Sequence, residues 1–494
     1  MSRDVSAVKA ELLHSFGELL GPLLDQAANG GLSAREAEVQ TWKLVIVLGR
    51  SVLIAVLSLL CLRVTQTAVL ERGLTMADVR TRMDNDYIGK LNSTFGKLRF
   101  PWFAFRDDEG HTHAPARKLF PQRPKMRVTE LLLEWECALA ADHPFRKAAE
   151  ALLFFSHGAA DVEDTTIERH AVLVGNAIPV EMLYMRSEKL RQVLEKKASR
   201  DSETGLPIIY ASTDAHALKR FVDENWDPKW KMVNGIRLWC VDRHTDKVIH
   251  VGGEFTWGDC HDVAERFKRL QKTGILPVDG NYGDGLTAQV TLCTDGIDWI
   301  AEHVLPLFPD AVMVLDPFHV VEQVADTSAK LHPGKKGKAA AKRIVKDGRK
   351  ALGMRNRRQR TKVRGGPVRE RYQRKASARE GSGQRLLDDV LLPLLRTVRR
   401  GKKRLLQLIA YVQRNLYRTH YGELRARGFK IGSGAMESLH RTGSQVRLKR
   451  AGCHWTETAS QAILNLRMLG LSGRWEDFWS QAAEIHLPAL MRGS

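Results

Sequence analysis

Three acidic residues of this chain, Asp214, Asp295 and Glu437, stand where they could bind metal ions. An apolar run at 290–293 stops at Asp295, and a short β-rich run at 207–210 leads to Asp214. Mg²⁺ in proteins is held by a few carboxylates together with water and substrate phosphate. Two such ions can activate a water or a 3′-hydroxyl and stabilise the leaving oxygen of a phosphodiester. We therefore predict a site for two Mg²⁺ ions, with Mn²⁺ as an alternative ion.

Other carboxylates compete for these roles. A second apolar run, at 311–315, stops at Asp316, so Asp316 rivals Asp295 on physical grounds alone. The two runs should form neighbouring strands, and the chemistry of open α/β sheets lies at the carboxyl ends of strands. Glu254 falls within a predicted strand and would support the site without binding metal, whereas Asp298 is placed to start a helix.

A second motif, at 429–455, surrounds the glutamate of this set. A flexible Gly-Ser-Gly turn at 432–434 leads into a predicted helix that carries Glu437. Basic side chains follow near it at helical spacing, where they could hold phosphates, and a tryptophan could stack on a displaced base. The DNA-binding residues predicted here are Arg441, Arg447, Lys449, Arg450 and Trp455. The alternative is a surface helix whose charges are solvated.

The positive charge of the chain is concentrated in one segment. The formal net charge is +20, yet residues 335–404 hold 26 Lys and Arg against 5 Asp and Glu, and the remaining residues hold 51 against 52. Clustered basic residues release counterions from a phosphate backbone, so a nucleic acid is the partner we predict. A solubilising linker and a membrane-surface patch are the alternatives.

The cysteines and the N-terminus indicate a cytoplasmic protein with no membrane contact. The six cysteines include no CxxC pair, and the adjacent pairs Cys260-His261 and Cys453-His454 have a spacing that metal sites do not favour. The N-terminus lacks the basic-then-apolar pattern of a signal peptide. The apolar stretch at 44–62 is interrupted by Gly49 and Arg50, so we expect a buried helix, packed against other helices or against a second subunit.

The order of predicted elements places the acidic residues on a sheet. From residue 205 the patterns give three strands, a helix, a strand, a helix and a strand, with a short crossover between the last two strands. This α/β order is that of a ribonuclease H-like mixed sheet, in which three antiparallel strands precede parallel strands joined by crossover helices. One acidic residue should end the first strand, and another should end the strand after the first helix.

Five regions follow from these patterns. Residues 1–125 are mainly helical, with a capping box at Ser33 and Glu36 that starts a long helix. Residues 126–204 form a helical domain in which 144–173 is either a helix-turn-helix, with Arg169 facing DNA, or an ordinary helical hairpin. The catalytic domain occupies 205–330 and 425–494, and a basic helical insertion at 331–424 divides it.

Taken together, these motifs resemble those of bacterial insertion-sequence transposases of the DDE class, and most closely the ISKra-type group. The resemblance covers residues 126–480. The motifs that carry it are STDAHAL (212–218), NGIRLWC (234–240), GGEFTWGDC (252–260), CTDGIDWI (293–300), LDPFH (315–319), IGSGAMESLHR (431–441) and RLKRAGCHW (447–455).

The resemblance implies that Asp214, Asp295 and Glu437 form the metal-binding triad. It also implies that His319, in Asp-x-x-His, positions the scissile phosphate or flanking DNA. We add Trp299 to the predicted DNA contacts. The expected activity is cleavage of transposon ends followed by strand transfer into target DNA, by a homodimer or a higher oligomer. A nuclease that cuts without joining and a catalytically silent DNA-binding regulator are the rival hypotheses.

Overall fold

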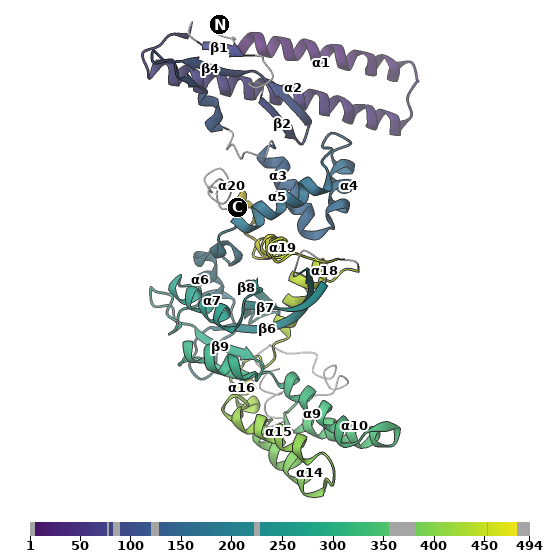
Figure 1. The fold of residues 1–494 in the computed structure, drawn as a ribbon, viewed down its shortest axis with the longest axis vertical. Coiled ribbons are helices and arrows are strands. Elements are labelled where there is room, and N and C mark those ends of the chain that lie inside the picture. Colours follow the sequence, from purple (N-terminus) through teal and green to yellow (C-terminus); the bar gives the residue numbers. More distant parts are fainter. Residues whose placement is uncertain are drawn as a thin grey trace. The chain divides into compact units, whose positions relative to one another are not determined.

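The computed structural model describes residues 5–76, 79–82, 89–119, 128–221, 228–354, 381–451 and 453–481. The chain divides into two compact units (Figure 1). The first comprises Met1–Ala177 with Glu476–Ser494, and the second comprises Ile178–Trp475. The second unit contains the mixed sheet and all the predicted metal ligands.

The unit boundaries differ from the predicted domains for reasons visible in the backbone. The predicted division at 125/126 falls inside the first unit, because Asn92 pairs with Val128 and accepts a hydrogen bond from the Thr129 N–H at 2.8 Å. The predicted division at 204/205 moves to 177/178. There the chain pairs with the sheet at once, through a bridge from Tyr184 to Gly252. Helix α6 (Ser187–Lys196) therefore belongs with the sheet.

The first unit begins with two long helices, α1 (Val5–Ala28) and α2 (Ala34–Leu70). The predicted capping box is confirmed, since the Ser33 hydroxyl accepts from the Glu36 N–H and the Glu36 carboxylate accepts from the Ser33 N–H at 2.9 Å. Gly49 and Arg50 do not interrupt α2. Gly49 packs against the ring of Phe95, and the Arg50 guanidinium donates to the Phe95 carbonyl at 2.8 Å.

One face of α2 is covered and the other is open. The covered face contacts β3 and β4, with Cys61, Leu98 and Phe100 fully buried between them. The prediction of a fully buried helix is therefore wrong for a single chain. The open face exposes the apolar side chains of Val45, Val52, Val56 and Leu60. Among the described residues, α2 is also the one helix long and apolar enough to cross a membrane, by length and composition only.

Short strands and a helical cluster complete this unit. Strands β1 (Val79–Arg82), β4 (Trp102–Arg106) and β5 (Thr112–His113) form one antiparallel sheet, β2 (Gly89–Ser93) and β3 (Gly96–Phe100) form a hairpin, and η2 (Pro115–Leu119) follows. Helices α3 (Glu130–Asp142), α4 (Phe145–Phe155) and α5 (Asp164–Ala177) pack on one another. The two helices predicted at 144–173 are confirmed. The two helices fit a helix-turn-helix and an ordinary helical hairpin equally well, so DNA binding by this region stays a prediction.

The second unit is built on a five-stranded mixed sheet with the order β10-β9-β6-β7-β8. Its strands are β6 (Ile208–Phe221), β7 (Pro228–Val241), β8 (Val248–Thr256), β9 (Gln289–Thr294) and β10 (Val312–Leu315). The first three pair antiparallel, whereas β6-β9 and β9-β10 pair parallel. The predicted order and directions of the strands are confirmed. The prediction was wrong about Asp214, which lies within β6 rather than at its end.

Helices cover the sheet and connect its strands. η3 (Val180–Leu183) precedes α6, α7 (Cys260–Lys272) precedes β9, and α8 (Asp298–His303) with η4 (Leu305–Leu307) joins β9 to β10. The chain later returns through α17 (Gly434–Leu439), the π-helical turn η8 (His440–Gln445) and α18 (Val446–Leu448). Helix α19 (Glu457–Leu471) then packs on β8. It is followed in the chain by α20 (Trp475–Ser480), which belongs to the first unit except for Trp475.

The insertion is helical throughout its described part. Helix α9 (Pro317–Leu331) leads into it. Its elements are α10 (Gly334–Ala351), α13 (Gly383–Leu386), the π-helical turn η6 (Leu387–Leu391), α14 (Leu392–Thr397), α15 (Lys402–Arg414), η7 (Leu416–Arg418) and the start of α16 (Tyr421–Arg427). Helices α9, α10, α14 and α15 lie together in Figure 1. Buried side chains of these helices share one hydrophobic core with Val314 and Leu315 of β10. Much of the basic segment, residues 355–380, lies outside the described residues.

Candidate active site

Three aspartates stand in a row across three neighbouring strands. Ala211 of β6 pairs with Leu292 of β9, and three residues further along each strand are Asp214 and Asp295. Leu315 of β10 pairs with Thr294, so Asp316 is level with Asp295. The Asp316 N–H also donates to the Thr294 carbonyl at 2.9 Å. Parallel pairing thus places Asp214, in the middle of β6, level with the carboxyl ends of β9 and β10, and the carboxyl ends of strands are where open α/β sheets bind their ligands.

Asp295 carries a half-buried carboxylate whose negative charge is only partly compensated by its neighbours. Burial raises its pKa above the ordinary value, and the nearby charge of Asp214 acts in the same direction. The Ile297 N–H donates to its Oδ1 at 3.2 Å, and this bond, with the charges of His319 and Arg418, partly opposes the shift. A buried carboxylate beside a second carboxylate is stabilised when a cation binds between them. Asp295 therefore has the electrostatic character of a metal ligand.

Asp316 has a different role because both its oxygens are already used by the chain. Its side chain is only 1% exposed. Oδ1 accepts from the Phe318 N–H at 2.9 Å and caps α9, while Oδ2 accepts from the N–H and the hydroxyl of Ser433. The hydrogen bonds from Ser433, a residue distant in the sequence, thus distinguish Asp316 from Asp295. Asp316 is an anchor that ties the Gly-Ser-Gly turn, and hence α17, to the sheet.

Helix α17 approaches Asp214 closely because the opposite strand has a glycine. Asp214 pairs with Gly235 of β7, and a Cβ on Gly235 would lie 2.4 Å from Met436 Cε and 2.9 Å from His440 Nε2. His440 is buried, and its Nδ1 lies 3.7 Å from Asp214 Oδ2. Glu437 lies between Met436 and His440 in the sequence and is exposed. The glycine therefore allows α17, the helix that carries Glu437, to pack against β7 beside Asp214.

Two histidines, His216 and His440, form a buried pair beside Asp214. Their ring centroids are 4.4 Å apart, and His216 Nε2 lies 2.9 Å from the Ser444 hydroxyl. Burial lowers the pKa of His216 to about 3, and the charges of His440 and Lys449 act in the same direction. Burial also lowers the pKa of His440, although the nearby carboxylates, Asp214 foremost, oppose this. Both imidazoles are therefore neutral at pH 7, and His440 lies beside Asp214 without neutralising it.

Sequence reasoning placed His440 only among the residues that follow Glu437 at helical spacing, and it did not assign His216 to the site, although a signal for His216 was present. Side chains alternate along a strand, so residues two apart share a face. His216 is two residues after Asp214 in β6 and lies on its face of the sheet. His440 lies at the start of η8, and π-helical turns occur frequently at functional sites.

The insertion contributes two further residues that hold the backbone around Asp295. Arg418 is fully buried, and its Nη2 donates to the Asp295 carbonyl at 3.1 Å and to the Thr294 hydroxyl. The Tyr411 hydroxyl packs so closely on Gly296 that a Cβ there would lie 2.4 Å from it. Burial, with the charge of Asp295, raises the pKa of Tyr411 to about 12. No sequence pattern indicated either contact, because both join segments far apart in the chain.

The predicted metal ligands are chemically suited to Mg²⁺, but they are not gathered around a single point. Among the residues that the structure describes, Asp214, Asp295 and Glu437 do not all place a carboxylate oxygen within 4.8 Å of one another. Two aspartates on neighbouring strands and a glutamate on a facing helix are oxygen donors, as a hard cation requires. Ligands of a two-ion site are spread around ions about 3.5–4 Å apart, and Glu437 is exposed on α17.

The remaining predicted site residues divide into exposed and buried groups. Arg441, Lys449 and Arg450 are exposed beyond α17, where they are open to a polyanion. His319 is half-buried, with Nε2 at 3.8 Å from Asp316 Oδ2. Trp299 is half-buried on α8. In the first unit, Arg169 is exposed on α5.

Two predicted DNA contacts are contradicted by their burial. Arg447 is 1% exposed and Trp455 is 5% exposed. The Arg447 guanidinium lies 4.7 Å from the centre of the Trp455 ring, and the indole N–H donates to the Leu448 carbonyl at 3.2 Å. A cation over an aromatic face is stabilised when both are desolvated. These residues hold α18 near the start of α19 and do not offer a surface to DNA.

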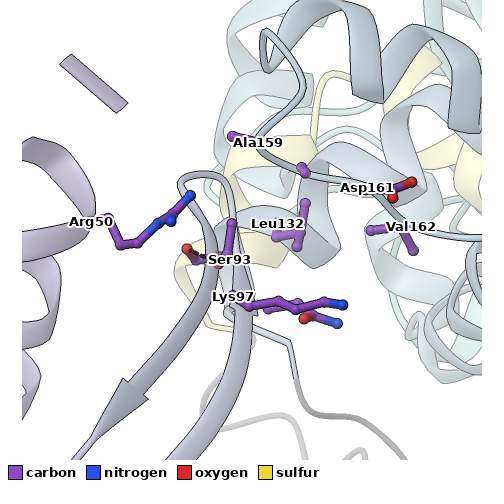
Figure 2. Close-up of a pocket in the computed structure, with 10 residues that line it drawn as sticks. Arg50, Ser93, Lys97, Leu132, Ala159, Asp161 and Val162 are labelled. Carbon is purple, nitrogen blue, oxygen red and sulfur yellow. Dashed lines mark hydrogen bonds between the residues drawn. The ribbon is translucent and has the colours of Figure 1, made fainter. Parts of the chain in front are cut away.

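A cleft in the first unit has a different composition (Figure 2). Arg50 from α2 and Lys97 from β3 lie at its walls, with Asp161 from the segment between α4 and α5. Its volume is about 220 Å³. Asp161 is the single carboxylate among its lining residues, so the cleft lacks the paired acidic ligands of the sheet.

Compared with known proteins, the chain matches no protein-family model and has no significant match among curated proteins.

Proposed function

We propose that this chain is a DNA transposase of the DDE class, with a ribonuclease H-like catalytic domain that uses Asp214, Asp295 and Glu437. The observation that carries the proposal is the placement of Asp214 and Asp295 on adjacent strands, level with one another and electrostatically coupled. The strand order β8-β7-β6-β9-β10, with three antiparallel strands followed by two parallel ones, supports the fold. The resemblance of the motifs supports the choice of transposition over other phosphodiester chemistry.

In this proposal the three carboxylates hold two Mg²⁺ ions. When bound, the ions would activate the attacking water or 3′-hydroxyl and stabilise the leaving oxygen. The protein contributes the positions of its ligands. His440 orients Asp214, and Arg418 fixes the backbone of Asp295. Asp316 anchors the turn from which α17 carries Glu437 toward the sheet.

DNA would lie along the exposed basic surfaces of the second unit. Arg441, Lys449 and Arg450 form one such surface. Helix α10 forms another, because its apolar side packs on α9 while its other side exposes basic residues, namely Lys335, Lys336, Lys338, Lys342, Arg343, Lys346 and Lys350. Clustered cations of this kind bind a phosphate backbone through counterion release. The strand-transfer step joins two DNA ends, and a homodimer would supply one site for each.

The test is cleavage of labelled DNA that carries the ends of the mobile element, with and without Mg²⁺. We expect the native chain to cut and to join strands, and Glu437→Gln to bind the same DNA without cutting. Glu195→Gln on α6, another exposed glutamate of this unit, is the matched control and should cut normally. Equal cutting by the native chain and Glu437→Gln would remove Glu437 from the site. Cutting without joining would indicate a nuclease, and binding without cutting by the native chain a silent regulator.

A further inference from the structure

A second group of metal-binding side chains lies on the helices that flank β9. Among the described residues, Cys260, His261 and His303 form the one set whose potential ligand atoms all lie within 4.8 Å of one another. Cys260 and His261 begin α7, and His303 ends α8. The two imidazole rings are 4.6 Å apart between centroids. The packing of α7 on α8 thus completes a cluster that the adjacent Cys-His pair did not suggest in the sequence.

The donor atoms of this cluster select a different class of metal from the carboxylate site. A thiolate and two imidazoles are ligands for Zn²⁺ and similar borderline ions, whereas Mg²⁺ prefers oxygen. Zinc lies about 2.3 Å from sulfur and about 2.0–2.1 Å from nitrogen, so its ligand atoms approach one another more closely than the 4.8 Å limit met here. Cys260 and His303 are half-buried and His261 is exposed, so small side-chain rotations could supply the difference.

Asp259, the residue that caps α7, directly precedes the cluster in the chain and contacts it. Its Oδ1 accepts from the His261 N–H at 2.8 Å. Three protein ligands plus a water or a carboxylate complete the tetrahedral coordination of zinc.

We propose that Cys260, His261 and His303 bind a Zn²⁺ ion that joins the start of α7 to the end of α8. Helix α8 begins at Asp298, immediately after the turn that follows Asp295. A metal at the far end of this short helix would fix its position, and with it the turn that leads away from Asp295. The inference rests on the cluster alone and does not depend on the proposed transposase activity.

The test uses Co²⁺, a spectroscopic substitute for Zn²⁺, titrated into the metal-free full-length chain. We expect one ion per chain, with a sulfur-to-metal charge-transfer band and the visible bands of tetrahedral coordination, both abolished by Zn²⁺. Cys260→Ser should remove the charge-transfer band, and His303→Ala should weaken Co²⁺ binding at least tenfold. Both side chains are accessible, and circular dichroism of each variant verifies that it is folded.

The chain offers a matched control in a second Cys-His pair. Cys453 and His454 have the same adjacent arrangement but are not part of any such cluster among the described residues. Cys453→Ser should leave the spectrum and the stoichiometry unchanged. The proposal is overturned if the folded native chain shows no charge-transfer band with Co²⁺, or if Cys453→Ser abolishes the band while Cys260→Ser retains it.

Discussion

Replacement of Gly235 by alanine tests whether α17 packs on the strand opposite Asp214. The added Cβ would lie 2.4 Å from Met436 Cε, 2.9 Å from His440 Nε2 and 3.0 Å from Phe255 Cε1. The end of Met436 can shift, but His440 and Phe255 are buried and have little room. Overpacking of this kind costs about 1–3 kcal/mol. The lower entropy of an unfolded chain with alanine offsets ~0.4–1 kcal/mol of that cost.

The net expectation is a loss of about 1–2 kcal/mol in the free energy that holds α17 against the sheet. Such a change increases the open population roughly 5–30-fold. Hydrogen exchange measured by mass spectrometry on peptides covering 434–448 would report it as faster exchange, and Mg²⁺-dependent cleavage should fall with it. Gly470→Ala is the control, because Gly470 lies in α19 with no atom within 4 Å of an added Cβ. That substitution should stabilise its helix by up to ~1 kcal/mol.

The result that would refute this reasoning is unchanged exchange at 434–448 in Gly235→Ala. It would mean that Met436 and His440 do not rest on β7, and Glu437 would then lack a route to the aspartates. Faster exchange across all of the second unit, equal for both glycine variants, would likewise contradict a local effect at Gly235.

Three further predictions concern charge. Asp295→Asn should raise the melting temperature at pH 7 without metal, because the raised pKa of Asp295 means that its ionised form destabilises the folded state. This gain should vanish as the pH falls to the pKa of an aspartate in the unfolded chain, near ~4. A lower melting temperature of the variant at pH 7 would contradict the prediction. Because His216 has a pKa of about 3, folding stability should be lost as the pH falls from ~6.5 toward 3, by as much as ~5 kcal/mol. Thermal melts of His216→Asn should therefore depend less steeply on pH in this range. An identical pH dependence in the variant would show that His216 is not the cause of the acid sensitivity. Arg447→Ala should lower the melting temperature by the equivalent of ~2 kcal/mol, with little effect on DNA binding by the folded chain, whereas Arg441→Ala should keep the melting temperature and reduce the salt dependence of DNA binding by about one ion. If Arg447→Ala instead weakened DNA binding without lowering the melting temperature, Arg447 would be a DNA contact.

The layout of the sheet could be predicted from the sequence because it depends on local patterns. Two apolar runs that each stop at an acidic residue indicate parallel strands with their carboxyl ends at one edge. The presence of five strands in this part of the chain, and the parallel direction of β9 and β10, followed correctly from such runs. The length of β6 did not, because residues 212–221 are not an apolar run and become a strand only by pairing with β7.

The finer assignments at the site required contacts between distant segments. Asp295 and Asp316 are equivalent in sequence, and only the hydrogen bonds from Ser433 distinguish them. The sequence predicts Arg447 to be a surface residue, but in the structure its guanidinium lies over the ring of Trp455. His303 joins Cys260 only through the packing of two helices. In each case the deciding partner is distant along the chain, and local spacing carries no information about it.

The sheet and the insertion share one hydrophobic core, so they cannot be separated into two folded pieces. Val314 and Leu315 of β10 pack in the same cluster as Leu352 and Leu405 of the insertion. The insertion also supplies Arg418 to the backbone of Asp295. Excision of residues 331–424 would expose this cluster to water and release the turn at Asp295. The second unit is therefore indivisible: it folds with its insertion in place, and a chain shortened by this segment would be unstable.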